Sequence, residues 1–319
     1  MCKAIRTLIP LLALLLAPAA ALAANPPPLV TADWLHGQLD RDDLVVLDIR
    51  NEIDGGSRAT YEAGHIPGAV YSDYLGDGWR VERNGVPAML PPIGDLELLF
   101  GRLGIANDST VVIVPAGVGS TDFGSAARVY WTFKVLGHDA VTILNGGHRA
   151  WVEAGHPLES GWYDRMPESF SADYRPELVA DTERVQRALD AGVQLVDNRP
   201  REQFRGDDKH PASRAAGTIP GAKNLQQQAM TQEGTAYMVD RERLEALLAE
   251  AGVNGDGEII TFCNTGHWAA IGWFAMSEIA GYRNVAMYDG SLTAWTQDEG
   301  RPLQVSRRGL AGLIDWLTN

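Results

Sequence analysis

Residues 257–270 of the chain read GEIITFCNTGHWAA. Residues 259–262 are apolar and β-branched, as in a buried parallel strand, and residues 269–280 are apolar at helical spacing. Cys263 lies in the short connection between this strand and this helix. Open α/β sheets place ligands at such connections, where the unpaired N–H groups of a helix start favour an anion, and a thiolate is an anion. The stretch therefore predicts an α/β fold with a thiol at a ligand-binding edge of its sheet.

Four landmarks of the chain occur twice in the same order, at separations of about 150 residues. They are a strand ending in Asp-x-Arg or Asp-Asn-Arg, a Gly-x-Ile-Pro-Gly-Ala turn, a second strand, and a glycine-containing turn followed by tryptophan. The paired segments are 44–50 and 194–199, 63–69 and 216–222, 111–114 and 259–262, and 145–151 and 289–295. The chain is therefore one domain duplicated. In each copy short strands alternate with amphipathic helices, which predicts a parallel sheet covered on both faces.

The first residues have the pattern of a secretory signal peptide. Lys3 and Arg6 precede an apolar run at 8–16, and small residues follow as far as Ala-Leu-Ala at 21–23. The apolar run is too short to cross a bilayer as a helix. We therefore expect residues 1–23 to be removed and the mature protein to be periplasmic, if the source is Gram-negative.

The expected mature chain keeps one thiol, because Cys2 belongs to the signal segment. An unpaired cysteine in an oxidising compartment favours a functional role for Cys263, and the alternative is a small buried hydrophobic residue. Without Lys3 and Arg6 the chain has 25 basic and 41 acidic residues, a formal charge of −16. This charge argues against nucleic acid and anionic membranes as partners, and an anionic substrate would need local positive potential.

The length and the local signals together predict where the domains begin and end. We expect a first domain at 24–163, a polar linker with prolines at 164–178, a second domain at 179–304 and a tail at 305–319. In the second domain, Asp181 and Asp240 are expected to cap helices, and Gly281 to end the helix after Cys263. A last short helix is expected around Leu313 and Trp316.

Taken in order, the landmarks resemble those of the rhodanese family of sulfurtransferases in its tandem form: strand-Asp-x-Arg, Gly-x-Ile-Pro-Gly-Ala, a strand followed by Cys-x-x-Gly, and Asp-Gly-Ser with a later Trp. The resemblance covers nearly the whole mature chain. It implies two tandem rhodanese-like domains, each a five-stranded parallel sheet flanked by helices, of which only the second is catalytic. It also implies that Cys263 takes sulfur from thiosulfate or a related donor, holds it as a persulfide, and passes it to cyanide or a thiol without a cofactor.

The resemblance also suggests roles for the residues around Cys263. The expected cradle for the thiolate and the persulfide is formed by the N–H groups of Asn264, Thr265, Gly266, His267 and Trp268. This loop has neither the basic residues of thiosulfate-using relatives nor the small residues of mercaptopyruvate-using ones. The possible substrate-binding residues are Arg199, Arg201, Gln203, Arg205, Asp289 and Ser291.

Gln203 stands where the family often has an anion-binding arginine. Arg201 and Arg205 flank it and are candidates for that role, although neighbouring positions point in other directions. Arg199 has a structural interpretation that we favour, an internal ion pair with Asp197. The same interpretation applies to Asp48 and Arg50 in the first copy.

The remaining loop residues have two interpretations each. His267 either supplies a positive charge or a proton to the loop, or is an exposed loop histidine. Trp268 is interpreted as the first packed residue of the following helix rather than as a platform for substrate. Asp289 and Ser291 either orient the loop or the donor, or form the turn that begins a helix at 291–297.

In the first copy, the position of Cys263 falls near Ala116, so no sulfur nucleophile is available there. We interpret this copy as a structural domain whose interface walls the active cleft. The alternative is a hydroxyl nucleophile, Ser120 or Thr121, with His65 or His148 as its base.

Other classes of protein are weighed against a sulfurtransferase. Cysteine phosphatases and arsenate reductases use a Cys-x5-Arg loop, but the sixth residue after Cys263 is Ala269. A persulfide carrier or binding module that serves a dedicated periplasmic partner is the other alternative. Seven scattered histidines and one mature thiol do not have the spacing of a zinc site, so we expect no metal.

Overall fold

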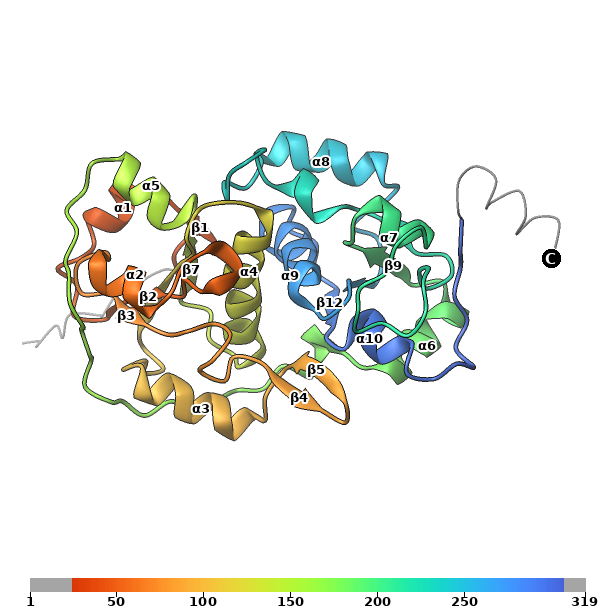
Figure 1. Ribbon diagram of the computed structural model, residues 1–319, viewed down its shortest axis with the longest axis horizontal. Coiled ribbons are helices and arrows are strands. Elements are labelled where there is room, and N and C mark those ends of the chain that lie inside the picture. Colours follow the sequence, from red (N-terminus) through yellow and green to blue (C-terminus); the bar gives the residue numbers. More distant parts are fainter. Residues whose placement is uncertain (1–24, 307–319) are drawn as a thin grey trace, which may run out of the picture.

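The computed structural model describes residues 25–306 (Figure 1). The elements of the first half are β1 (Leu29–Val30), α1 (Ala32–His36), β2 (Leu44–Asp48), η1 (Glu52–Asp54), α2 (Arg58–Ala63), β3 (Val70–Tyr71), β4 (Val81–Arg83), β5 (Val86–Met89), α3 (Ile93–Arg102), β6 (Thr110–Val114), α4 (Ser120–Val135), β7 (Val141–Leu144) and α5 (Gly147–Glu153). Those of the second half are η2 (Pro176–Leu178), β8 (Val179–Ala180), α6 (Thr182–Ala191), β9 (Gln194–Asp197), α7 (Arg201–Arg205), β10 (Lys223–Asn224), η3 (Gln227–Met230), α8 (Arg241–Glu250), β11 (Ile259–Phe262), α9 (His267–Phe274), η4 (Ala275–Ile279), β12 (Val285–Tyr288) and α10 (Ser291–Trp295). The predicted signal segment and the predicted tail helix lie outside the described residues.

Each half contains one five-stranded sheet in which every pair of neighbouring strands is parallel. The strand orders are β1-β7-β6-β2-β3 and β10-β9-β11-β12-β8, while β4 and β5 form a separate antiparallel hairpin. The central strands β2, β6 and β11 are buried along their whole length, as continuous apolar runs require. The predicted α/β class, with a five-stranded parallel sheet in each half, is confirmed.

Local signals place the helices of the second half. The carboxylates of Asp181 and Asp240 accept the N–H groups of Arg184 and Arg243 at 2.7 and 2.8 Å, so both predicted caps are confirmed. Helix α9 starts at His267 and continues into the wider turn of η4, which ends just before Gly281. The predicted helix at 291–297 is α10, which ends at Trp295.

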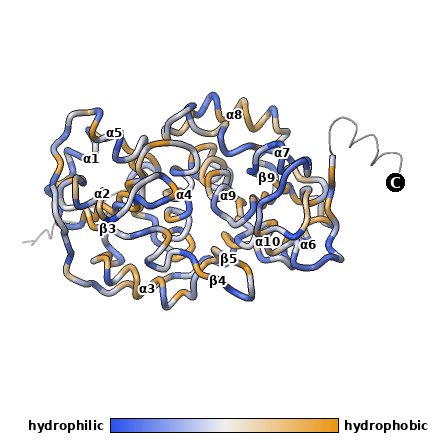
Figure 2. The backbone as a smooth tube through the Cα atoms, viewed as in Figure 1, coloured by the Kyte–Doolittle hydropathy of each residue, from blue (hydrophilic) through white to orange (hydrophobic). Residues whose placement is uncertain are grey.

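The two halves share a core. Helices α4 and α9 lie side by side at the centre of the molecule, as Figure 1 shows. The ring of Phe274 meets Phe123 and Tyr130 edge to face, with centroids 5.6 and 5.0 Å apart. One hydrophobic cluster runs from the first sheet through these helices into the second, and hydrophilic stretches follow the outer loops (Figure 2). The interface is therefore a fixed wall for any site beside it.

The segment between the two sheets follows the surface of the first half. Phe170 packs against Phe100, with ring centroids 4.8 Å apart, and the N–H of Asp173 donates to the carbonyl of Leu136 at 2.9 Å. The predicted linker segment is therefore anchored rather than loose. Among the described residues, no helix has both the length and the apolar character needed to cross a membrane.

The hairpin β4–β5 extends from the first half towards the second (Figure 1). The carbonyl of Gly85 in its turn accepts the Nε2 hydrogen of Gln297 at 3.0 Å. Just after β5, the N–H of Leu90 donates to the carboxylate of Asp289 at 2.6 Å. These contacts bring the residues that precede β4 to the carboxyl end of β11.

Candidate active site

Cys263 follows β11 directly, and its side chain is buried at the start of the connection to α9. The connection is tight because Gly266 has a φ of +76°. A Cβ added at Gly266 would lie 2.3 Å from Nη1 of Arg128, a residue of α4. This position therefore requires glycine both for its backbone conformation and for the space occupied by the first domain.

Ser291 holds the loop in shape. Its Oγ accepts the N–H groups of Cys263 and Gly266 at 3.0 and 3.1 Å and donates to the carbonyl of Tyr288 at 2.8 Å. Ser291 itself has a φ of +49°, an uncommon conformation for a residue with a side chain. Of the two roles considered for Ser291, the structure places it as a residue that orients the loop.

Of the five N–H groups in the predicted cradle, that of Gly266 is bound to Oγ of Ser291. The N–H groups of Asn264 and Thr265 have no hydrogen-bond partner within residues 25–306. These two groups follow the sulfur in the chain and remain available for an anion. The N–H of Gly266 is therefore withdrawn from the predicted cradle, while those of Asn264 and Thr265 beside the sulfur stay free.

A pocket of about 230 Å³ opens onto the loop. Residues from both halves line it: Cys263, Asn264, Thr265, His267, Trp268 and His210 come from the second half, and Ile53, Arg80 and Thr121 from the first. No Asp or Glu is among these lining residues. The thiol therefore lies at a cleft between the two halves, and the cleft has no negative carboxylate in its wall.

His267 is buried between the two halves and is 8 % exposed. Its Nε2 donates to the carbonyl of Thr121 at 2.8 Å, so its Nδ1 accepts the hydroxyl hydrogen of Tyr74 at 2.9 Å. Burial, followed by the positive charge of Arg80, lowers the pKa of His267 to about 3. Both interpretations from sequence are wrong: the imidazole is neither exposed nor charged at neutral pH, and both of its nitrogens are already used.

Trp268 is half-buried and belongs to the first turn of α9. It packs against the shared core and also lines the pocket. Its Nε1 donates to Oγ1 of Thr121 at 3.3 Å. The predicted packing role is present, and the ring also forms part of the pocket wall.

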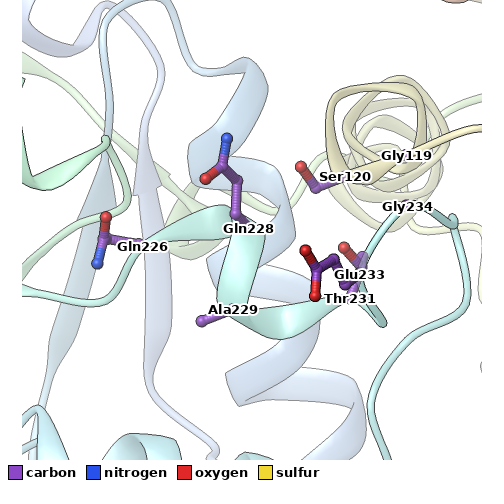
Figure 3. Close-up of a pocket in the computed structure, with 8 residues that line it drawn as sticks. All are labelled: Gly119, Ser120, Gln226, Gln228, Ala229, Thr231, Glu233 and Gly234. Carbon is purple, nitrogen blue, oxygen red and sulfur yellow. The ribbon is translucent and has the colours of Figure 1, made fainter.

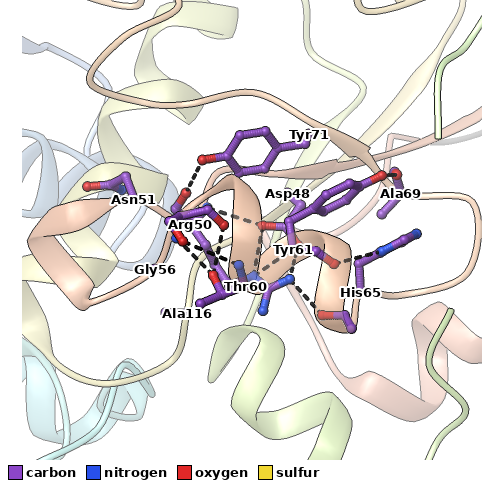
Figure 4. Close-up of polar contacts among 12 residues, drawn as sticks. Asp48, Arg50, Asn51, Gly56, Thr60, Tyr61, His65, Ala69, Tyr71 and Ala116 are labelled. Atoms are coloured by element: carbon purple, nitrogen blue, oxygen red, sulfur yellow. Dashed lines mark hydrogen bonds and ion pairs between the residues drawn. The ribbon is translucent and has the colours of Figure 1, made fainter. Parts of the chain in front are cut away.

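The two Asp-x-Arg segments form buried ion pairs. Nη2 of Arg199 lies 2.6 Å from the carboxylate of Asp197, and Arg50 and Asp48 make the same pair at 2.8 Å. Figure 4 shows the network of the first half, in which Arg50 lies between Asp48 and neighbouring backbone groups. The predicted ion pairs are confirmed, and Arg199 is not placed to bind substrate.

The residues around Gln203 do not supply a charge to the pocket. Arg201 is exposed, and Arg205 lies 3.5 and 3.8 Å from two acidic neighbours in its own segment. Gln203 instead supports the loop, since its Oε1 accepts the Nδ2 hydrogen of Asn264 at 2.8 Å. Neither arginine lines the pocket, so they do not replace the arginine that the family often has there.

Asp289 joins the two halves. Its carboxylate lies 2.5 Å from Nη2 of Arg128, in an ion pair that is almost fully buried, and it also accepts the N–H of Leu90. Both partners belong to the first half. Asp289 therefore fixes the interface under the loop and does not face the pocket.

Sequence reasoning missed four residues that complete the site: Ile53, Arg80, His210 and Tyr74. Ile53, Arg80 and Tyr74 come from the first half, where no motif marks them. His210 lies in a long irregular segment between α7 and β10. The sequence predicted only that the first domain forms one wall of the cleft. That prediction does not identify the individual residues of the wall.

The alternative hydroxyl nucleophiles have no base. Oγ1 of Thr121 accepts the hydrogen of Trp268, and no hydrogen bond within the described residues joins Ser120 or Thr121 to either proposed histidine. Nδ1 of His65 is bound to the carbonyl of Tyr61 at 3.0 Å. Burial, with a smaller effect of Arg50, lowers the pKa of His148 to about 4. The geometry does not support a catalytic dyad there.

A larger pocket, of about 610 Å³, lies between the start of α4 and residues 226–234. Figure 3 shows its lining, which is mostly polar and includes Ser120, Gln228 and Glu233 but neither a thiol nor an imidazole. Within residues 25–306, no group of three or more His, Cys, Asp or Glu side chains is arranged to hold a metal ion. The smaller pocket, which contains the thiol, is therefore the candidate active site.

Comparison with known proteins gives the same fold and covers both halves. The family profile "Rhodanese-like domain" matches residues 31–154 and 181–298. A Haloferax volcanii protein named "Putative thiosulfate sulfurtransferase" is 34% identical over 295 residues, covering 86% of this chain and 96% of that protein. The "Sulfur carrier protein TtuD" of Thermus thermophilus is 33% identical over 294 residues, covering 88% and 97%.

A solved structure extends this likeness to three dimensions. SseA from Escherichia coli, described as a 3-mercaptopyruvate sulfotransferase, superposes with a TM-score of 0.72 at 28% identity, covering 83% of this chain and 99% of SseA. The two matched segments contain the two parallel sheets described above. The chain therefore belongs to the rhodanese-like family and consists of two tandem rhodanese-like domains.

Proposed function

We propose that the protein is a sulfurtransferase that carries a sulfane sulfur as a persulfide on Cys263. One observation carries this proposal: the thiol lies at an interdomain pocket, followed by two unbound N–H groups. An anionic sulfur atom would be stabilised there. The names of the relatives, thiosulfate sulfurtransferase, sulfur carrier and 3-mercaptopyruvate sulfotransferase, all support sulfur chemistry.

The reaction divides into two displacements. In the first, the thiolate of Cys263 attacks the outer sulfur of thiosulfate, a new S–S bond forms, and sulfite leaves with the electrons of the old one. In the second, cyanide or a thiolate attacks the terminal sulfur, and Cys263 leaves again as a thiolate. No external oxidant is needed, and the scheme predicts ping-pong kinetics. With 3-mercaptopyruvate, Cys263 would attack the sulfur, the C–S bond would break, and the carbon would leave as the enolate of pyruvate, which takes up a proton to give pyruvate.

A second function is a persulfide carrier for a dedicated protein partner. The likeness to the sulfur carrier protein TtuD, over 88% of this chain, favours this alternative specifically. The same Cys263 persulfide would form, but the acceptor would be a thiol of a protein partner rather than a small molecule. Negligible thiosulfate:cyanide activity together with a tight protein partner would favour this role.

We also propose that the protein works in the periplasm. The signal-peptide pattern of residues 1–23 supports this location. A mature chain with one cysteine fits an oxidising compartment, since it has no second thiol with which to form an internal disulfide. Fractionation of the native host, with the mature N-terminus read by mass spectrometry, tests the proposal. An uncleaved cytoplasmic protein would contradict it.

Intact-mass spectrometry tests the proposed chemistry directly. The purified protein is measured before and after thiosulfate, then with 3-mercaptopyruvate, and the series is repeated with Cys263→Ser. We expect the wild type alone to gain the mass of one sulfur and to lose it on addition of cyanide. No gain from either donor would contradict sulfur transfer from small donors and leave the carrier role as the better reading.

A further inference from the structure

The pocket of Cys263 needs a positive charge, because both thiosulfate and 3-mercaptopyruvate are anions that must approach a thiolate. The protein as a whole repels anions, with a formal charge of −14. The residues suggested by sequence do not supply the charge: Gln203 is neutral and bound to Asn264, and Arg201 and Arg205 lie outside the pocket. A cation must therefore come from elsewhere.

Arg80 is the arginine that lines the same pocket as Cys263. It belongs to the first domain and lies just before β4, where the hairpin contacts hold the chain against the second domain. Its guanidinium carbon lies 4.3 Å from the centre of the Tyr74 ring, so the side chain is held by stacking. The hydroxyl of Tyr74 in turn binds His267 of the Cys263 loop.

Arg80 has no partner of opposite charge. Within residues 25–306 it makes no ion pair, and its Nε is buried without a hydrogen bond. This differs from the arginines of the two Asp-x-Arg segments and from Arg128, all of which are paired with a carboxylate. Arg80 is a half-buried guanidinium without a counter-ion, and the pocket beside it has no carboxylate in its lining. Such a charge favours the binding of an anion.

We propose that Arg80 binds the anionic group of the sulfur donor, a sulfonate oxygen pair or a carboxylate, and so holds the transferable sulfur next to Cys263. The planar guanidinium matches two oxygens at once. The first domain would thus supply the donor-binding charge, while the second supplies the nucleophile. This inference rests on the proposed sulfurtransferase function for the identity of the anion, but not for the existence of an anion site.

Alkylation of Cys263 tests the anion site without any sulfur chemistry. Iodoacetate is an anion and iodoacetamide is neutral, and both alkylate the same thiol. The rate with iodoacetate divided by the rate with iodoacetamide therefore measures the attraction of the pocket for an anion. A change in the reactivity of the thiol affects both rates and cancels in this ratio. We expect this ratio to fall about tenfold in Arg80→Met, since a hydrogen bond to a charged group is typically worth at least that factor. Methionine keeps an apolar stem against Tyr74.

Arg83→Met is the matched control, because Arg83 is exposed, lies three residues away and does not line the pocket. It removes the same charge from the same hairpin, and we expect its rate ratio to stay within about twofold of the wild type, as for a screened surface charge. An unchanged ratio in Arg80→Met, or an equal fall in Arg83→Met, would overturn the proposal.

Two further measurements complete the test. Sulfate, an oxyanion that does not react with iodoacetamide, should protect wild-type Cys263 from that reagent. This measurement needs no variant if Arg80→Met fails to fold, and absence of protection would overturn the proposal. Persulfide loading by thiosulfate should slow about tenfold or more in Arg80→Met. The exchange of Cys263 with an uncharged organic trisulfide, which forms a mixed polysulfide and releases a thiolate, should not slow. If no donor loads the wild type but the alkylation ratio still falls, the sulfurtransferase function fails and the anion site stands.

Discussion

The loops that follow β6 in the first domain and β11 in the second domain differ in what their N–H groups bind. After β11, the loop of the second domain presents a thiol and leaves the N–H groups of Asn264 and Thr265 free. After β6, the loop of the first domain closes around a carboxylate of its own helix. The side chain of Asp122 accepts the N–H groups of residues 116, 117 and 118 at 2.9, 2.5 and 2.9 Å.

This comparison shows that the first domain lacks more than a cysteine. The N–H groups of its loop are present, but they already bind the carboxylate of Asp122. The half-buried carboxyl of Asp54 lies beside Asp122, and partial burial together with the charge of Asp122 raises the pKa of Asp54 to about 7. Burial raises the pKa of Asp122 as well, but its hydrogen bonds from three N–H groups oppose that effect, so we place the proton of the pair on Asp54 below that pH. In the first domain this loop therefore has a structural role, whereas in the second domain it holds the thiol.

The strongest test of the difference is removal of the thiol. We expect Cys263→Ser to lower the rate of sulfur transfer by about 10³-fold or more, because a neutral hydroxyl is a far weaker nucleophile and cannot carry a persulfide. Steady-state assays with each donor measure the loss, and circular dichroism and thermal unfolding check the fold. Retention of a tenth of the activity would move the reaction away from Cys263 and break the comparison.

The loop geometry gives the next prediction. Gly266→Ala should lower activity at least tenfold and the free energy of unfolding by about 2–3 kcal/mol, because the new Cβ meets both an unfavourable φ and the guanidinium of Arg128. Gly221→Ala is the control: it has a φ of +75° and nothing within 4 Å of the added carbon. We expect it to cost about 1 kcal/mol and to leave activity unchanged. If Gly266→Ala and Gly221→Ala lowered activity and stability equally, the effect at Gly266 would come from its backbone conformation alone and not from the contact with Arg128.

Much of the second domain's loop was accessible from sequence because its signals are local. The strand before Cys263, the caps Asp181 and Asp240, and the buried pair of Asp197 with Arg199 each depend on a few neighbouring residues. His267 was misread because nothing near it in sequence makes it buried. Tyr74 and Thr121, both from the first domain, impose that state.

The donor site was out of reach for the same reason. Arg201 and Arg205 were candidates only by their closeness in sequence to Gln203, and one residue along a helix turns a side chain by about 100°. Arg80 reaches the pocket only through the packing of the two domains. The periodicity of apolar residues within one helix or strand does not indicate which side chains of one domain contact the other domain.

The carboxyl pair of the first domain predicts a pH effect on stability. Asp54 has a folded-state pKa of about 7, above its ordinary value, so the folded state binds its proton more tightly than the unfolded state does. Its contribution is fully present below pH 4 and is lost as the pH rises towards and through 7. Asp54→Asn, which imitates the protonated group, should remove this loss. Relative to that variant, we expect the wild type to lose about 1–2 kcal/mol between pH 5 and 8.

Denaturant unfolding of both proteins across this pH range measures the difference. Asp42→Asn is a control for the removal of one carboxylate, since Asp42 is exposed. Parallel curves for the wild type and Asp54→Asn would mean that Asp54 is ionised in the fold. The first-domain cradle would then hold two charges rather than one.

The smallest expected effect comes from giving the first domain the missing thiol. Pro115→Cys places sulfur at the position that answers Cys263, because the carbonyls of Pro115 and Cys263 accept the equivalent N–H groups of His148 and Leu292. The carboxylate of Asp122 already uses the N–H groups that would stabilise a persulfide there. We expect turnover to remain within about twofold of the wild type, as is usual for a change outside the reacting groups. By intact mass, thiosulfate should add one sulfur rather than two. A gain of sulfur by Pro115→Cys in the Cys263→Ser background would show that the missing cysteine alone makes the first domain inactive, and that the N–H groups bound to Asp122 do not.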